Sequence, residues 1–172
     1  IDWSWNLLEP WEQSSLAQLS IFRGGFTMES AEAVLWLQDH PTAPWLLDII
    51  QSLLDRSLLR ANPGSDQPRF SLYESIREYA SEKLDVDQDA LETRFIHHFS
   101  SYGQSPRQAV LRAGGSQARQ MLDELENLIH AFDLSIHHKH PEAIDCFMAV
   151  NDALERVGPL ARIQELSLLL ND

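Results

Sequence analysis

The sequence predicts a mainly helical protein in which three helices are followed by a small β-hairpin and then by antiparallel helical hairpins. Apolar residues recur at intervals of three and four over most of the 172 residues, which is the spacing of an amphipathic helix. Residues 58–72 instead place two short strand-like runs around a turn-forming segment. Short breaks containing proline or glycine separate the later helices, and helices joined in this way pack as antiparallel neighbours.

The first helix with a clear apolar stripe is predicted to begin at Pro10, because proline is tolerated at the first helical position. Gly24 and Gly25 are predicted to end it through a residue with positive φ. Thr27 is predicted to cap the next helix, since its hydroxyl oxygen accepts a hydrogen bond from a free N–H group of the first turn. The side chains predicted to be buried are Trp11, Leu16, Leu19 and Phe22 in the first helix and Ala31, Val34 and Leu35 in the second.

A third helix is predicted from Pro44, and the segment 62–66 (Asn-Pro-Gly-Ser-Asp) is a strong turn signal between the two strand-like runs. Three helices followed by a hairpin constitute a winged helix, with the hairpin as its wing. The residues of the third helix predicted to face inward are Trp45, Leu46, Ile49, Ile50, Leu53 and Leu54. Two exit helices follow, marked by Ile76, Tyr79, Ala80 and Leu84 and then by Leu91, Phe95, Phe99 and Tyr102.

The domains are predicted to be residues 1–105, the winged-helix module with its exit helices, and residues 106–172, a set of helical hairpins. The stretch 103–116 contains three glycines and a proline, which is typical of an irregular connection. Beyond it, a packing seam is predicted at Leu122, Leu125, Ile129, Phe132 and Ile136. Breaks at His140-Pro141 and Gly158-Pro159 lead to helices through Ile144, Phe147, Val150, Leu154 and Val157, and through Leu160, Ile163 and Leu166.

Composition predicts a globular cytoplasmic protein, with 44% hydrophobic and 23% charged residues and a single cysteine, Cys146. No apolar run approaches the roughly 18 residues that cross a bilayer. Because the chain opens within an apolar pattern that includes Trp3 and Trp5, we expect it to be a piece of a longer protein. Aromatic residues left uncovered there are a candidate contact for a homo-oligomer.

Charge disfavours direct binding to nucleic acid. Residues 1–105 carry seven Lys/Arg against sixteen Asp/Glu, a balance of −9, whereas phosphates attract basic surfaces. The polar positions of the third helix, which reads DNA in DNA-binding winged helices, are Asp48, Gln51, Ser52, Asp55 and Arg56. The wing adds Arg60 and Arg69 to the strands but Asp66 to the turn, so a winged helix used for intramolecular packing is the favoured interpretation.

Four stretches, in this order and spacing, resemble a known family. They are IDWSWNLLEPWEQSSLAQLSIFRGGFTMESAEAV, LLDIIQSLLDRSLLR, RFSLYESIREYASEKL and DELENLIHAFDLSI. The first three resemble the winged-helix segment of bacterial STAND-type regulatory ATPases, relatives of the NB-ARC signalling ATPases and of AfsR- and LuxR-like transcriptional regulators. The fourth is similar to the start of the helical, TPR-like region that follows in those proteins. The resemblance covers residues 1–138 most closely.

The resemblance implies a molecular switch. In that family an upstream nucleotide-binding domain binds ADP or ATP, the winged helix closes over the nucleotide, and downstream repeats sense a ligand or partner. In the NB-ARC relatives a Met-His-Asp motif before the exit helix reaches the nucleotide phosphates. The matching tripeptide here is Leu72-Tyr73-Glu74, in which tyrosine replaces the histidine. Tyr73, Glu74 and Arg77 are therefore the candidate contact with the nucleotide domain.

No catalytic site or cofactor site is predicted within the chain itself. It lacks a G-x-x-x-x-G-K-[ST] P-loop and any pattern typical of an activated nucleophile, so we expect no ATP hydrolysis and no other enzymatic activity. A weak metal candidate is formed by His130, Asp133 and His137, which share one face of a helix at positions i, i+3 and i+7. Imidazoles on a polar helix surface are the alternative interpretation.

We therefore expect a regulatory function, in which this region relays the nucleotide state of an upstream domain to a downstream sensor domain. Its partners would be those two domains. Two alternatives stay open at this point: a winged-helix transcription factor that binds DNA directly, and a TPR-like scaffold that binds a peptide or protein.

Overall fold

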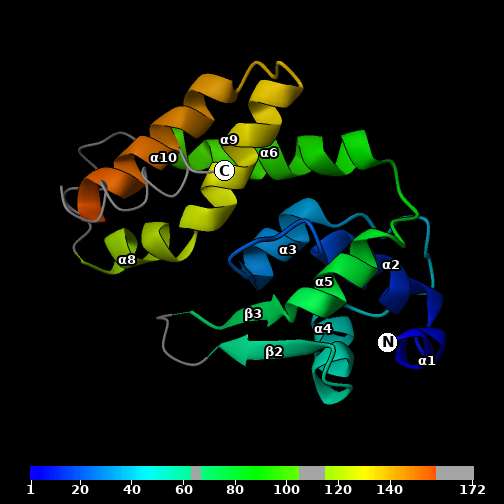
Figure 1. Ribbon diagram of the computed structural model, residues 1–172. Helices are drawn as coiled ribbons and strands as arrows, with labels where there is room; N and C mark the ends of the chain where they lie inside the picture. Colours follow the sequence, from blue (N-terminus) through cyan, green and yellow to red (C-terminus); the bar gives the residue numbers. More distant parts are fainter. Residues whose placement is uncertain (63–66, 105–114, 158–172) are drawn as a thin grey trace. The chain divides into compact units, whose positions relative to one another are not determined.

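The computed structural model describes residues 1–62, 67–104 and 115–157, and it confirms the mainly helical class (Figure 1). The chain forms two compact units, Ile1–His98 and Phe99–Asp172, which are considered separately below. The predicted boundary between residues 105 and 106 falls outside the described residues. So does the predicted helix through Leu160, Ile163 and Leu166, and both stay predictions.

The first unit follows the predicted order of three helices, a hairpin and exit helices. The three helices are α2, α3 and α4, and a short helix α1 precedes them. In chain order the elements are α1 (Asp2–Asn6), α2 (Pro10–Leu19), β1 (Phe26–Thr27), α3 (Met28–Val34), α4 (Leu46–Asp55), β2 (Leu59–Asn62), β3 (Arg69–Leu72), α5 (Glu74–Ser81) and α6 (Gln88–Gln104), which begins in this unit.

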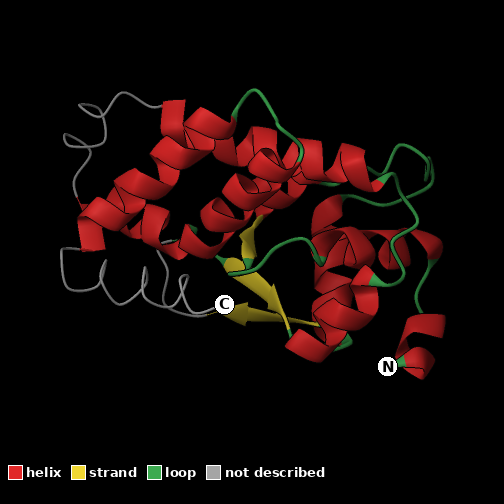
Figure 2. Cartoon of the chain, turned by 45° about the horizontal axis from the view of Figure 1, so that its top comes forward, coloured by secondary structure: helices red, strands yellow, loops and turns green. Residues whose placement is uncertain are grey.

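The predicted hairpin is part of a three-stranded sheet. Strands β2 and β3 pair antiparallel, with Leu59 opposite Leu72. The other edge of β3 pairs with β1, where Phe26 lies opposite Phe70, so the strand order is β1-β3-β2 (Figure 2). The sequence does not reveal β1, because a strand of two residues is too short to show the alternation that marks a strand.

The two glycines do not end the first predicted helix. Helix α2 ends at Leu19, and its cap Ser20 has a right-handed conformation with φ −64°. The following N–H groups bond carbonyl groups three residues back, which tightens the chain into turns before the sheet. Gly25 does have positive φ, +85°, and a Cβ atom there would lie 2.7 Å from the carbonyl oxygen of Phe70. Glycine is thus needed where the chain passes close to β3.

The caps of α2 and α3 are formed by local side chains. As predicted, Thr27 caps α3: its hydroxyl accepts a hydrogen bond from Ser30 N (3.1 Å), and Ser30 Oγ accepts one from Thr27 N (2.9 Å). At α2 the buried carboxylate of Glu12 accepts a hydrogen bond from Glu9 N (2.9 Å) and another from the hydroxyl of Ser52 on α4. A first-turn carboxylate therefore also joins α2 to α4.

An aromatic core joins the helices of this unit to its sheet. The ring centroids of Phe22 and Phe26 are 5.2 Å apart, and those of Phe22 and Phe95 are 5.4 Å apart in an edge-to-face arrangement. The largest side chains that are almost wholly buried here are Leu16, Leu19, Phe22, Phe26, Ile49, Ile50, Leu53, Phe95 and Ile96.

A buried glutamine connects α2 to the segment after α3. Gln18 is fully buried, and its Oε1 accepts a hydrogen bond from Trp36 N (2.7 Å). Its Nε2 donates to Trp36 O (2.9 Å) and to Ser14 Oγ (3.2 Å). From α6, Arg94 Nε donates to Val34 O (2.7 Å). The segment 34–36 is therefore fixed by side chains from two helices.

The second unit contains a packed helical hairpin. Its elements are the end of α6, α8 (Gly115–Asp123), α9 (Leu125–His137) and α10 (Ala143–Val157). Helices α9 and α10 lie side by side in both views (Figures 1 and 2). The predicted break at His140-Pro141 is confirmed: His140 N bonds Ser135 O (2.8 Å), and Lys139 takes φ 51° in the turn.

The buried face of this hairpin differs from the predicted one. Ile136, which belongs to the predicted packing seam, is 55% exposed. Ile144 and Phe147, which belong to the predicted apolar series of the next helix, are 73% and 55% exposed. Residues spaced three and four apart also form the adjacent face of each helix, and this adjacent face is the buried one. It carries small side chains that let α9 and α10 approach closely. Its buried members are Leu128, Ala131 and Ser135 on α9 and Cys146, Ala149 and Ala153 on α10.

Within the described residues, no helix combines the length and the apolar character that spanning a membrane requires.

Gly25→Val should lower the free energy of unfolding by about 1–3 kcal/mol, because valine is strained at positive φ and its Cβ would press on the backbone of Phe70. Urea unfolding followed by circular dichroism would measure the change. Gly24→Ala is the matched control, since Gly24 does not have positive φ. Equal stability of Gly25→Val and the unsubstituted chain would contradict this account of the corner.

Gln18→Leu should destabilise the chain by about 1–3 kcal/mol, because the peptide groups of Trp36 lose their partners while leucine keeps the volume. Gln51→Leu removes an exposed glutamine that bonds Asp55 in the same helix, so it should cost about 0.5 kcal/mol or less. Similar melting temperatures for the two variants would refute the special role of Gln18.

Candidate functional site

The outward side of α4 is the part of the first unit that a DNA-binding winged helix would present to DNA. Ile49, Ile50 and Leu53 face the core, and the opposite side is exposed. The prediction that Trp45 faces inward is wrong: it is 85% exposed, because it precedes the first turn and does not follow the helical period. We call five exposed residues of this side the α4 outer face: Trp45, Leu47, Asp48, Gln51 and Asp55. Arg56, the residue after the helix, is exposed as well.

The chemistry of the α4 outer face is apolar and acidic. Leu47 is 62% exposed beside Trp45, and Gln51 Nε2 donates to Asp55 Oδ1 (2.8 Å). Arg56, which follows the last residue of the helix, has its Nε atom 4.0 Å from Oε1 of the buried Glu12. Two carboxylates and two large apolar side chains are suited to contact with a protein surface that carries apolar and basic groups. The two carboxylates repel the phosphates of DNA.

The two arginines of the wing are engaged within the module. Arg60 Nε donates to Ser71 Oγ (2.8 Å), and the Arg60 guanidinium lies 5.2 Å from the centroid of the Tyr73 ring. Arg69 is buried, and its Nη2 reaches Gly24 O (3.4 Å). These contacts direct both guanidinium groups toward the protein.

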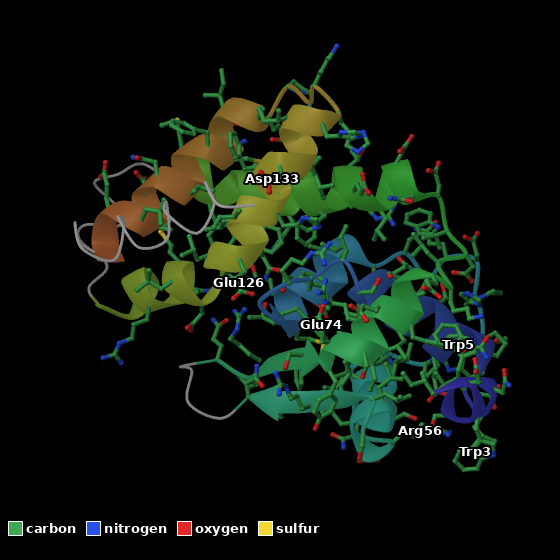
Figure 3. All side chains as sticks on the ribbon, viewed as in Figure 1. Trp3, Trp5, Arg56, Glu74, Glu126 and Asp133 are labelled. Carbon is green, nitrogen blue, oxygen red and sulfur yellow. The ribbon has the colours of Figure 1, made fainter. Side chains whose placement is uncertain are left out.

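Among the residues predicted to contact a nucleotide domain, Tyr73 is accessible to solvent, whereas most of the Arg77 side chain is buried. Tyr73 is the N-terminal cap of α5, and its side chain is 46% exposed. The guanidinium of Arg77 forms a two-point ion pair with Glu74, whose label in Figure 3 marks the start of α5. The Arg77 side chain is only 16% exposed, so its donors are committed to Glu74.

The weak metal candidate is not assembled. His130, Asp133 and His137 all lie on α9, where Asp133 and His137 are exposed (Figure 3 labels Asp133). In the described residues, their ligand atoms do not gather within 4.8 Å of one another. The His137 ring instead packs edge-on against the ring of His138, and partial burial raises the pKa of Asp133.

Cys146 has the surroundings of a structural cysteine. It is buried on the inner face of α10, and burial raises the pKa of its thiol to about 11. A thiol with that pKa is protonated at neutral pH, whereas a nucleophilic cysteine needs its thiolate.

The exposed aromatic residues at the start of the chain belong to α1. Trp3 is 76% exposed and points away from the helix (Figure 3). Trp5 is partly covered, with its ring 5.6 Å from that of Tyr79. Of the two tryptophans, Trp3 is the one that presents an open apolar surface.

Comparison with known proteins finds relatives among large mycobacterial proteins. The chain is 30% identical over 141 residues to "Putative HTH-type transcriptional regulator Rv0890c" of Mycobacterium tuberculosis, and equally to its counterpart in Mycobacterium bovis. The match covers 81% of this chain but only 16% of each relative. "Uncharacterized protein Rv0894" of M. tuberculosis is 30% identical over 121 residues, which are 69% of this chain and 30% of that protein.

No protein-family model matches the chain, and no solved structure matches it. At 30% identity the similarity is distant. It involves a small part of each of the large proteins named as putative transcriptional regulators. The fold of the first unit is winged-helix-like, and the matched residues are a small part of the length of these relatives.

Proposed function

We propose that this chain is a non-catalytic regulatory region of a STAND-type ATPase or transcriptional regulator, which relays nucleotide state between an upstream nucleotide-binding domain and downstream repeats by intramolecular packing. The observation that carries the proposal is the α4 outer face. A helix used to read DNA needs donors for phosphates and bases, but this face offers Asp48, Asp55 and two large apolar side chains. Such a surface suits contact with another protein domain.

The exit of the wing supplies a second part of the proposed contact. Tyr73 is exposed at the junction of β3 and α5, next to Glu74. In the proposed assembly Tyr73 packs on the nucleotide domain. Arg77 holds Glu74 in place through their ion pair, so that the acidic side chain faces that domain with a defined orientation. ADP or ATP would bind to the upstream domain.

A protein-interaction scaffold is the second candidate function, and the second unit favours it. Ile136, Ile144, Phe147 and Met148 are all more than one third exposed on the α9–α10 hairpin. Exposed apolar side chains gathered on a hairpin are typical of a surface that another helix or a partner covers. Direct DNA binding, which the names of the mycobacterial relatives suggest for those proteins, would require a further domain under either proposal.

Duplex DNA should bind to this chain weakly and without sequence preference, because the −9 balance of residues 1–105 repels phosphates and the wing arginines are engaged. Fluorescence anisotropy with a labelled random duplex, titrated from low to physiological salt, would measure this. Submicromolar affinity at physiological salt, with a steep salt dependence, would contradict the packing proposal and support the transcription-factor alternative.

In the longer protein that the proposal implies, Trp45→Ala with Leu47→Ala, and separately Tyr73→Ala, should change the rate of nucleotide exchange by roughly tenfold, the loss expected from removing one well-packed interface anchor. Release of a fluorescent ADP analogue would measure the rate. Trp3→Ala is the matched control, since it removes an exposed tryptophan on α1 that the proposal does not use.

Circular dichroism should show that each variant keeps its fold, because the substituted side chains are exposed. Unchanged exchange in both test variants would remove these surfaces from the mechanism. If peptide or protein binding instead responded to Ile144→Ser or Phe147→Ser alone, the scaffold function would be the correct one.

A further inference from the structure

The first unit contains a pocket that the proposed relay does not use. It has a volume of about 440 Å³ and lies between the segment after α3 and the start of α6. Small-molecule sites commonly measure about 300–1,000 Å³. Its apolar lining comes from Trp36, Val86 and Ala90, and its charged lining from Asp39, Asp85, Asp87 and Arg94. We call it the Trp36 pocket.

The guanidinium of Arg94 brings an unpaired positive charge to this pocket. Its Nε is fixed by Val34 O, and its Cζ lies 5.8 Å from the centroid of the Trp36 ring. Its Nη2 atom is buried without a hydrogen-bond partner, and no carboxylate in the described part of the chain forms an ion pair with it. Burial lowers the pKa of Arg94, an effect that Asp87 partly opposes from a distance.

The three carboxylates of the pocket differ in their hydrogen-bond partners. Asp87 Oδ1 accepts hydrogen bonds from Asp89 N (3.0 Å) and Ala90 N (3.3 Å) at the start of α6, and Asp85 Oδ1 accepts one from Ser14 Oγ (3.2 Å). Asp39 is exposed and has no partner within the described residues. One pocket is thus lined by a carboxylate, that of Asp39, and a guanidinium, that of Arg94, and the two do not form an ion pair with each other.

We propose that the Trp36 pocket binds a free amino acid with an apolar or aromatic side chain. The ligand's carboxylate would accept hydrogen bonds from Arg94, and its ammonium group would lie against Asp39, with Asp85 nearby. Its side chain would pack on Trp36, Val86 and Ala90. A simple anion would meet three carboxylates and a simple cation would leave Arg94 unpaired, so a zwitterion fits this charge pattern better than either.

The wall of the pocket is held in place before any ligand binds. Gln18 accepts from and donates to the peptide groups of Trp36, and Arg94 holds the carbonyl of Val34 two residues earlier. A wall fixed in this way loses little conformational freedom on binding, which favours affinity for a small ligand.

Titration of the 172-residue chain with L-phenylalanine, followed by NMR of the Trp36 indole N–H, tests the proposal. The signal is assigned with Trp36→Phe. L-Phenylalanine should bind saturably and at least about tenfold more tightly than 3-phenylpropionate, which lacks the ammonium group, or 2-phenylethylamine, which lacks the carboxylate, because each loses a charge-assisted contact.

Asp39→Asn should weaken L-phenylalanine binding by about tenfold, and Arg94→Lys should do so while keeping the charge but losing the planar fork. Glu32→Gln removes one exposed negative charge from α3, outside the pocket, and should bind as the unsubstituted chain does. Absence of saturable binding at millimolar concentration, or equal affinity for L-phenylalanine and 2-phenylethylamine, would overturn the proposal. Neither result would bear on the relay, whose test reads nucleotide exchange.

Discussion

The side-chain amide of Gln18 sets the position of the chain after α3, and the arrangement of the first unit depends on it. A fully buried amide in an apolar core is costly unless its donors and acceptor are paired. Here the two peptide groups of Trp36 and the hydroxyl of Ser14 pair it completely. The N–H and C=O groups of Trp36, in the irregular segment between α3 and α4, are therefore paired by a side chain of α2, and α6 adds a second anchor through the bond from Arg94 to Val34 O. Trp36 is presented at the surface as a result.

The same module shows why a winged-helix-like fold does not determine whether a protein binds DNA. Fold sets where the third helix and the wing lie, and the side chains on them decide what they can contact. In this chain the third helix carries Asp48 and Asp55 outward, and the wing arginines turn back to Ser71 and to the carbonyl of Gly24. The helices and the sheet have the winged-helix-like arrangement, while the outer face of α4 carries two carboxylates and two large apolar side chains.

The second unit is packed by small residues, and this leaves its large apolar residues at the surface. Ala131, Ala149 and Ala153 let α9 and α10 approach closely. Ile144 stays exposed, and Phe147 is about half exposed although its ring lies 5.8 Å from the ring of Phe132 on α9. Small side chains at a helix contact let the two backbones approach closely, and larger side chains such as Leu128 fill the remaining space in the buried face. An acidic chain thus retains an apolar surface on this hairpin.

Sequence alone determined the features that depend on neighbouring residues. The Thr27 cap, the wing strands, the break at His140 and the positive φ of Gly25 all follow from local geometry and local hydrogen bonding. Only the tertiary structure decided the features that depend on residues far apart in the chain. Gly25 is needed where the chain approaches Phe70, the side chains of Trp45 and Ile144 are exposed to solvent, and Asp39 lines the same pocket as Arg94. The physical reason is that apolar periodicity in the sequence indicates that a helix has an apolar face. Which of two neighbouring faces is buried depends on the element that packs against the helix.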